Sequence, residues 1–263
     1  MKKILITGAG SYIGTSFENY MGQWSDKYSV DTVDMIDGSW RKKDFSGYDV
    51  VFHVAGIAHI KETKENSELY YKVNRDMAVE TAKKAKAEGI KQFVFLSSMS
   101  VYGMETGVIT KDTKPNPTTN YGKSKLMAEK DIMDVEDSSI NIAILRPPMI
   151  YGEGCKGNYN SLIKFANKLP VFPNIKNKRS MLEINHLCKF VKEVIDGDNE
   201  GLFFPQDEEY VCTSLMVKEI AEKNGKKIYL TKILNPFVKF AMVMPGSIGK
   251  MASKAFGDLV YEM

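Results

Sequence analysis

Arginine, histidine and cysteine are scarce in this sequence of 263 residues. Four of the 36 basic residues are arginine, and there are three histidines and three cysteines. No cysteines stand at CxxC spacing and the histidines have no Cys or carboxylate partner at ligand spacing, so no metal site is expected. An odd number of widely spaced cysteines fits structural thiols in a reducing compartment better than a disulfide framework.

Long apolar runs are also absent. No stretch approaches the roughly 18 apolar residues that a membrane span requires, and the basic start of the chain is followed by an apolar run that stops at Thr7, with no cleavage site. The apolar segment Phe237–Met244 is interrupted by Lys239. We interpret it as an amphipathic helix of a substrate lobe or of a partner interface rather than a membrane contact. A cytoplasmic protein without a membrane partner is expected.

Neither sign of charge dominates the chain. The 36 basic residues face 33 acidic ones, which gives a formal charge of +3, and the charges are scattered. Nucleic-acid binding, which uses a basic arm or stripe, is therefore not expected. The composition, with 43% hydrophobic and 26% charged residues, predicts a folded chain.

The order of predicted elements indicates an α/β fold. Up to Arg146, short β-branched runs alternate with longer amphipathic stretches, as in repeated βαβ units around a parallel sheet. In the predicted helix Leu69–Glu88, one stripe recurs every four residues and Gly89 ends the helix. The stripe consists of Leu69, Val73, Met77, Thr81 and Ala85. The predicted strands are Lys3–Thr7, Ser29–Val33, Asp49–Val54, Gln92–Ser97 and Asn141–Leu145, and further helices are predicted over Tyr121–Val135, His186–Asp196 and Thr213–Asn224.

A glycine-rich turn follows the first predicted strand. Gly8, Gly10 and Gly14 stand between that strand and a predicted helix, where backbone amides can approach a pyrophosphate. Asp34 ends the second strand about 20 residues later, where a carboxylate can accept hydrogen bonds from ribose hydroxyls. The pair predicts NAD rather than NADP, since Asp34 repels a 2′-phosphate and Arg41 is the nearest cation that could attract one.

Tyr121 and Lys125 stand four residues apart on a predicted helix and therefore on one face. Ser97 and Ser98 end the fourth strand, at the sheet edge where doubly wound folds bind ligands. A lysine ammonium one turn away favours the phenolate and lowers the pKa of the tyrosine. Such a tyrosine can remove a hydroxyl proton while hydride leaves the same carbon.

In combination these segments resemble the extended short-chain dehydrogenase/reductase family, in particular its NAD-dependent nucleotide-sugar epimerase/dehydratase branch, over about residues 3–190. The resemblance implies a Rossmann doubly wound domain over 1–150, with about 186–205 added, and a small substrate-binding lobe made mostly of 151–263. The matching segments are TGAGSYIG at Thr7–Gly14, VFHVAG at Val51–Gly56, VNRDMA at Val73–Ala78, FLSSMSVYG at Phe95–Gly103, YGKSK at Tyr121–Lys125 and LRPPMIYG at Leu145–Gly152.

The resemblance also implies residue roles. Ser98 binds the reacting sugar oxygen, Tyr121 is the acid/base, and Lys125 tunes Tyr121 and holds the nicotinamide ribose. Asn158 and Arg179 match positions that hold the nucleotide diphosphate, with Ser98, Ser100 and Tyr121 completing the substrate contacts. The implied cofactor contacts are Gly8, Gly10, Ser11, Tyr12, Ile13, Gly14, Asp34, Asp44, Phe45, Ala55, Gly56, Asn74, Ser97, Tyr121, Lys125 and Pro148. Asp44 and Phe45 correspond to an acidic and apolar pair around adenine, and Asn74 to a residue that acts partly through its neighbours.

Three features depart from the family pattern. Ser11 stands where the middle glycine of the fingerprint is usual, so the phosphate turn is expected to differ in detail. Met99 and Ser100 replace the acidic pair that dehydratases carry after the catalytic residue, which argues against 4,6-dehydration. The chain ends at Met263 with no arginine after Arg179, so the substrate lobe is expected to be reduced or completed by something else.

The sequence therefore predicts an NAD-dependent 4-epimerase of a nucleotide sugar, a UDP-hexose or UDP-N-acetylhexosamine, acting through a 4-keto intermediate. An NAD(P)H-dependent reductase of a 4-keto-6-deoxy nucleotide sugar uses the same catalytic residues and stays open. A non-catalytic NAD(P)-binding sensor or scaffold is a third reading, disfavoured by the intact Ser98, Tyr121 and Lys125 set. The resemblance further implies a homodimer through the helices at about 69–88 and 121–135.

Overall fold

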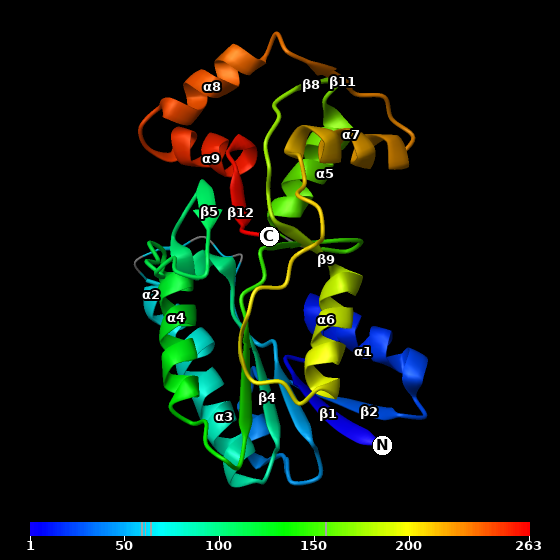
Figure 1. The fold of residues 1–263 in the computed structure, drawn as a ribbon, viewed down its shortest axis with the longest axis vertical. Coiled ribbons are helices and arrows are strands. Elements are labelled where there is room, and N and C mark those ends of the chain that lie inside the picture. Colours follow the sequence, from blue (N-terminus) through cyan, green and yellow to red (C-terminus); the bar gives the residue numbers. More distant parts are fainter. Residues whose placement is uncertain (59, 61, 64, 156) are drawn as a thin grey trace. The chain divides into compact units, whose positions relative to one another are not determined.

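The computed structural model describes residues 1–58, 60, 62–63, 65–155 and 157–263. The chain divides into two units (Figure 1): unit 1 comprises residues 1–103, 115–148 and 183–205, and unit 2 comprises 104–114, 149–182 and 206–263. Residues 104–114 were expected in the first domain. They belong to unit 2 because strand β5, Gly107–Ile109, pairs in parallel with β12, Leu259–Tyr261, from the end of the chain.

Unit 1 is built on a parallel sheet of six strands in the order β10-β6-β4-β3-β1-β2. The predicted α/β fold with a parallel sheet is thereby confirmed. The strand order reverses between β1 and β3, which is the point where doubly wound folds bind ligands. The strands are β1 Lys2–Thr7, β2 Tyr28–Val33, β3 Val50–His53, β4 Gln92–Leu96, β6 Asn141–Leu145 and β10 Gly201–Phe203.

Helices cover both faces of this sheet. In Figure 1, α1 and α6 lie on one side and α3 and α4 on the other. All residues of β3 and β4 are buried, as expected for near-continuous apolar strands in the middle of a covered parallel sheet. The helices of unit 1 are α1 Tyr12–Met21, α2 Ser67–Tyr71, α3 Met77–Ala87, α4 Asn120–Met133 and α6 Ile184–Asp196.

The predicted helix Leu69–Glu88 is interrupted by a π turn. Residues Lys72–Asp76 form this turn between α2 and α3. A π turn accommodates one extra residue per turn, so α2 is rotated relative to α3. For this reason Leu69, predicted on the buried stripe, is 43% exposed, whereas Thr81 and Ala85 are fully buried.

Unit 2 has its own small core around α5 and α7, which includes Leu162, Phe172 and Val217. Three two-stranded sheets surround it, β11-β8, β12-β5 and β7-β9. Among the residues that the structure describes, no helix has the length and apolar character to cross a membrane. The remaining elements are β7 Met149–Tyr151, α5 Asn158–Lys168, β8 Val171–Pro173, β9 Met181–Glu183, α7 Thr213–Lys223, β11 Tyr229–Thr231, α8 Asn235–Val243 and α9 Ser247–Phe256.

Phe93 tests the packing between the sheet and α3–α4. Its ring is fully buried in the main apolar cluster, so Phe93→Ala should lower the free energy of unfolding by about 3–5 kcal/mol. Leu202→Ala, at a side chain 43% exposed on the edge strand β10, should change it by roughly 0.5 kcal/mol or less. Urea unfolding of both variants measures the difference, and equal effects would contradict this view of the core.

Candidate active site

The loop after β1 has the form of a dinucleotide-binding turn. Gly8 adopts φ +102°, and a Cβ built on it would lie 3.1 Å from the backbone of Ala55, so the loops after β1 and β3 touch here. A Cβ on Gly14 would lie 3.2 Å from the side chain of Ile6. Both glycines are therefore required by close packing at the start of α1.

Ser11, which departs from the family pattern, caps helix α1. Its hydroxyl accepts a hydrogen bond of 3.2 Å from the Gly14 N–H. Gly10, one residue earlier, has φ +71° and open space around its Cα. A serine is thus accommodated because the positive φ of the turn falls on Gly10.

Asp34 is exposed directly after β2, and its Oδ1 accepts a hydrogen bond of 2.8 Å from the Ile36 N–H. Arg41, the cation considered for a 2′-phosphate, pairs with Glu80 at 2.5 Å. Glu80 neutralises the charge of Arg41. Arg41 is therefore less able to attract a 2′-phosphate, and Asp34 favours ribose hydroxyls.

Of the two residues predicted to lie around adenine, Asp44 is exposed and Phe45 is buried. Asp44 is exposed, and its Oδ1 accepts from the Ser46 N–H at 2.8 Å. The ring of Phe45 is fully buried in the core, with the Lys84 ammonium 4.8 Å from its centre. The Phe45 ring is thus part of the core, and its contact with adenine stays a prediction.

Asn74 fastens the loop after β3. From the π turn, its Oδ1 accepts from the Ile57 N–H at 2.8 Å and its Nδ2 donates to the Ile57 carbonyl at 3.0 Å and to Ser124 Oγ at 3.2 Å. A Cβ on Gly56 would lie 2.9 Å from Asn74 Oδ1 and 3.5 Å from Lys125 Nζ. Asn74 therefore holds the loop in a position where Gly56, which has no side chain, lies next to the Lys125 ammonium.

The three predicted catalytic residues converge at the carboxyl end of β4. Tyr121 lies in the first turn of α4, and the Ser98 hydroxyl acts on its phenol to lower its pKa. Lys125, one turn later, is 4% exposed, and its Nζ donates to the Leu96 carbonyl at 2.7 Å. Ser98 Oγ also accepts from the Ser100 N–H at 3.1 Å. The spacing of four residues on α4 thus does place Tyr121 and Lys125 on the same side of the helix.

Burial shifts the pKa values of Tyr121 and Lys125. It raises the pKa of Tyr121, which the hydrogen bond from Ser98 opposes. It also lowers the pKa of Lys125 to about 8, which the Glu129 carboxylate opposes. From the spacing of the two residues, Lys125 is expected to lower the pKa of Tyr121. In the protein alone the pKa is raised instead, since loss of water around the phenol outweighs its stabilising partners.

A buried ionic network lies beside Lys125, and the sequence motifs do not predict it. Glu129, one turn beyond Lys125, pairs with Arg146 at 2.6 Å and accepts from the Ser97 hydroxyl. Arg146 Nη1 also donates to the Tyr102 hydroxyl at 2.8 Å. The signals were the scarcity of arginine and the i, i+4 spacing of Glu129 from Lys125. Ser97, predicted as a cofactor contact, directs its hydroxyl into this network.

Gly122 explains how α4 comes so close to Ser98. A Cβ on Gly122 would lie 2.6 Å from the carbonyl oxygen of Ser100. Only glycine allows this approach, because any side chain would push the first turn of α4 away from the loop that follows β4. The glycine within YGKSK therefore has a packing role that the sequence pattern alone does not reveal.

The remaining predicted residues of unit 1 surround these loops. Tyr12 and Ile13 are partly buried in the first turn of α1, and Ala55 is 6% exposed. Ser100 is exposed, and Pro148 is buried after β6. Their contacts with a ligand stay predictions.

Asn158 and Arg179 belong to unit 2. Asn158 is exposed at the first position of α5. Arg179 is partly buried: its backbone pairs with Val211, and Nη1 donates to the Gly257 carbonyl at 3.0 Å. Burial lowers the pKa of Arg179, while the nearby carboxylates raise it. Their binding of a diphosphate stays a prediction.

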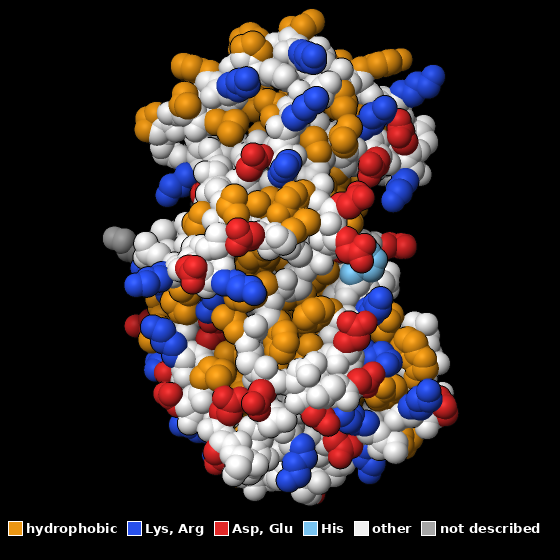
Figure 2. All heavy atoms as spheres, in the orientation of Figure 1, with side chains coloured by type: hydrophobic (Ala, Val, Ile, Leu, Met, Phe, Trp, Pro, Cys, Tyr) orange, Lys and Arg blue, Asp and Glu red, His pale blue; other side chains and the backbone are white. Residues whose placement is uncertain are grey.

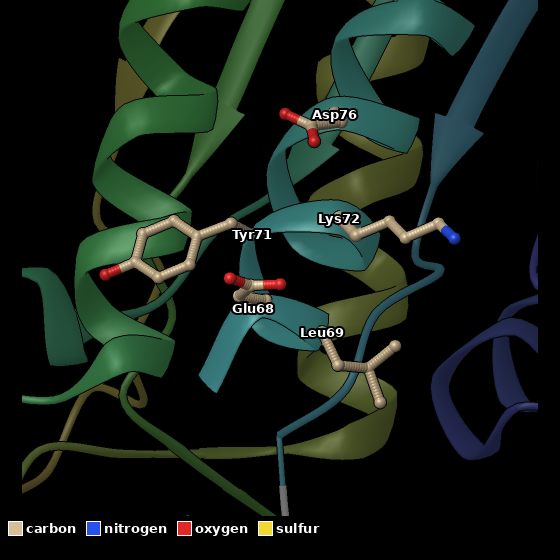
Figure 3. A pocket seen from close by; sticks show the side chains of 5 residues that line it. All are labelled: Glu68, Leu69, Tyr71, Lys72 and Asp76. Atoms are coloured by element: carbon tan, nitrogen blue, oxygen red, sulfur yellow. The ribbon is translucent and has the colours of Figure 1, made fainter. Parts of the chain in front are cut away.

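An open hollow of about 630 Å³ lies elsewhere on unit 1 (Figure 3). It is lined by α2 and the π turn, with charged side chains in the majority. None of the predicted site residues contributes to it, so this hollow is not the active site. Its lining residues are Glu68, Leu69, Tyr71, Lys72 and Asp76.

Comparison with known proteins agrees with this geometry. Residues 4–200 match the model of the NAD dependent epimerase/dehydratase family. A UDP-glucose 4-epimerase of Vibrio cholerae is 32% identical over 246 residues, which are 84% of this chain and 75% of that protein. The N-acetyl-alpha-D-glucosaminyl-diphospho-ditrans,octacis-undecaprenol 4-epimerase of Escherichia coli O157:H7 is 25% identical, covering 86% of this chain and 73% of its own length.

Solved structures show the same fold. The UDP-glucuronic acid 4-epimerase of Bacillus cereus in complex with NAD superimposes with a TM-score of 0.73 at 18% identity, covering 98% of this chain and 88% of that one. A dTDP-4-dehydrorhamnose reductase of Bacillus anthracis gives 0.76 at 16% identity, covering 100% and 91%. The chain belongs to the NAD-dependent epimerase/dehydratase family. It is an NAD-dependent enzyme of the epimerase and oxidoreductase type.

The residues present fit the cofactor. There is open space at Gly10 in the turn after β1, Asp34 is exposed, and Gly56 has no side chain between its backbone and Lys125. When bound, NAD supplies a hydride acceptor and donor. The turn after β1 would hold its pyrophosphate, Asp34 a ribose, and Lys125 the ribose next to the nicotinamide.

Gly8→Ala tests the phosphate turn. The substitution forces a side chain into φ +102° and against Ala55, which costs on the order of 1–3 kcal/mol, so NAD affinity should fall about tenfold or more. Gly22→Ala, at the end of α1 with φ −55° and open space around it, is the matched control and should bind NAD normally. Calorimetric titration measures both, and unchanged affinity in Gly8→Ala would contradict the assignment.

The depressed pKa of Lys125 predicts a pH dependence of stability. Between about pH 8 and the ordinary lysine value of 10.5, the unfolded chain binds more protons than the folded one, so this lysine costs less stability as pH rises. Relative to Lys125→Met, the wild-type protein should gain about 2 kcal/mol between about pH 7 and pH 9.5. Urea unfolding of both proteins across this range measures the gain. A difference independent of pH would refute the shift.

Proposed function

We propose that this enzyme is a nucleotide-sugar 4-epimerase that acts on a UDP-hexose or UDP-N-acetylhexosamine. The observation that carries the proposal is the convergence of Ser98, Tyr121 and Lys125 at the carboxyl end of β4. It is supported by the relative from Vibrio cholerae, which is named for UDP-glucose 4-epimerisation.

Each catalytic side chain has one task in this mechanism. Tyr121 exchanges a proton with the 4-hydroxyl of the sugar, and Ser98 donates a hydrogen bond to the same oxygen as it becomes a ketone. Lys125 keeps its ammonium beside the backbone of Gly56, next to the position proposed for the ribose. Because burial raises the pKa of Tyr121, the phenol is also a competent donor when the ketone is reduced again.

Epimerisation requires the 4-keto sugar to turn over and to be reduced on its other face. A 4-reductase uses the same residues on a 4-keto-6-deoxy sugar supplied from outside, and three of the similar structures are dTDP-4-dehydrorhamnose reductases. Dehydration is disfavoured, since Met99 is buried and Ser100 carries no carboxyl group that could protonate a departing 6-hydroxyl. A polyprenyl diphospho-sugar is the alternative epimerase substrate, given the name of the Escherichia coli relative.

The decisive experiment incubates the purified protein with UDP-glucose, UDP-N-acetylglucosamine or an undecaprenyl diphospho-N-acetylhexosamine, each with NAD, and resolves the 4-epimers by NMR. A galacto-configured product without net NADH formation establishes epimerisation. Turnover only of a 4-keto-6-deoxy nucleotide sugar with NADH or NADPH would assign the reductase activity instead. No turnover of any of these together with retained NAD binding would favour the sensor or scaffold reading.

Tyr121→Phe tests the acid/base assignment. It removes the phenolic proton but not the ring, so kcat should fall by about 10²–10⁴-fold while NAD affinity is unchanged. Tyr71→Phe is the matched control: this tyrosine of α2 donates to Asn120 Oδ1 at 3.2 Å, and the substitution should leave kcat within about twofold. Full activity of Tyr121→Phe would overturn the mechanism.

We propose that α2–α3 and α4 form the interface of a homodimer. On this face the guanidinium of Arg75 joins the π turn to Asp131 of α4 at 2.6 Å, and Met127 and Met133 are more than a third exposed. The hollow in Figure 3 opens on the same group of helices. Light scattering that gives the mass of one chain at micromolar concentration would refute this interface.

A further inference from the structure

Helices α8 and α9 of unit 2 display apolar side chains to solvent. No residue of α8 is buried, and Phe237 is 70%, Phe240 68% and Val243 78% exposed. In α9, Ile248 is 49% and Met251 70% exposed. Residues three apart lie on one side of a helix, so each helix presents an apolar face. We call α8 and α9 together the α8–α9 hairpin, since the two helices pack against each other.

Within the segment 226–257, which contains this hairpin, every charged side chain is a lysine. Between residues 226 and 257 the sequence contains no aspartate or glutamate. All six lysines of this segment are exposed. Figure 2 shows the result at the upper left, where Figure 1 places α8 and α9, as apolar and basic side chains side by side. Lys239 lies on α8, and Lys250 and Lys254 lie on α9. Lys226, Lys227 and Lys232 precede the hairpin, and Lys226 donates to the Asn167 carbonyl at 2.7 Å.

This arrangement fits one kind of partner best. A helix with exposed aromatic and aliphatic side chains on one face and lysines beside them is typical of segments that lie in a membrane interface and attract anionic lipid. A second copy of the hairpin fits poorly, because the contact would bring lysines against lysines without any carboxylate in this segment. Contiguous exposed apolar faces also often mark binding sites in soluble proteins.

We propose that the α8–α9 hairpin docks on a lipid surface that contains anionic headgroups. Phe237, Phe240 and Val243 enter the boundary between headgroups and acyl chains, and the lysines meet the lipid phosphates. The nine residues of α8 rise only about 13 Å, so the helix lies along the surface. From the sequence alone no membrane partner is expected, and Phe237–Met244 is interpreted as a helix of a lobe or partner interface. The exposure of its aromatic rings is the observation that changes this interpretation.

Co-sedimentation of the full chain with vesicles tests the proposal. One set of vesicles is phosphatidylcholine alone and the other is phosphatidylcholine mixed with phosphatidylglycerol. The wild-type protein should bind the mixed vesicles at least about tenfold more strongly, and added salt should weaken that binding. The double variant Phe237→Ser, Phe240→Ser should lose about tenfold or more in the partition coefficient. Lys239→Glu with Lys250→Glu should lose a similar factor on mixed vesicles only.

Matched controls come from other helices of the same unit. Leu215→Ser removes a 52% exposed apolar side chain from α7, and Lys164→Glu reverses an exposed charge on α5; both should bind like the wild type. Absence of vesicle binding by the wild type, equal binding to both lipids, or equal losses in the controls would overturn the proposal. So would a lipid-free dimer that the double Phe variant dissociates, because the occupant would then be a second copy. None of these outcomes depends on catalysis.

Discussion

The buried ammonium of Lys125 is the constraint around which the active site is arranged. It is 4% exposed, donates to the Leu96 carbonyl at 2.7 Å and lies 4.6 Å from the centre of the Phe95 ring. Removing a cation from water is costly unless nearby groups compensate for it. The fall of its pKa to about 8 shows that the carbonyl, the ring and Glu129 compensate only in part. The fold therefore keeps an under-solvated positive charge where the chemistry takes place.

The neighbouring ionic network explains why that charge is not cancelled. Glu129 could neutralise Lys125, but it is engaged by Arg146 and by the Ser97 hydroxyl. The two cations and one carboxylate leave one positive charge, and a Cβ built on Gly56 would lie 3.5 Å from Lys125 Nζ. A ligand that brings hydroxyl oxygens to this position restores the solvation that the lysine has lost. The incompletely solvated charge of Lys125 would therefore favour both ligand binding and catalysis.

How far the sequence predicts this site depends on the kind of interaction. The strands and the positions of Tyr121 and Lys125 could be predicted because they follow from apolar periodicity and helical spacing. The π turn could not, since an extra residue inside a helix leaves the local apolar pattern plausible, and it changes the exposure of Leu69. The roles of Gly122 and Glu129 depend on which backbone and which guanidinium lie opposite them, and no spacing along the chain specifies these long-range contacts.

Binding strength and substrate choice depend on different groups of the protein. Arg179 is held by its backbone bonds to Val211 and by the Gly257 carbonyl, so little side-chain entropy remains to be lost if it grips a diphosphate. A diphosphate is common to all nucleotide sugars, and an interaction shared by every substrate discriminates among none. Choice of sugar must then come from groups that approach the ring itself. In unit 1 the exposed hydroxyl of Ser100 accepts a hydrogen bond of 3.1 Å from Ser98. A change at Ser100 would therefore shift a hydrogen bond that aligns Ser98.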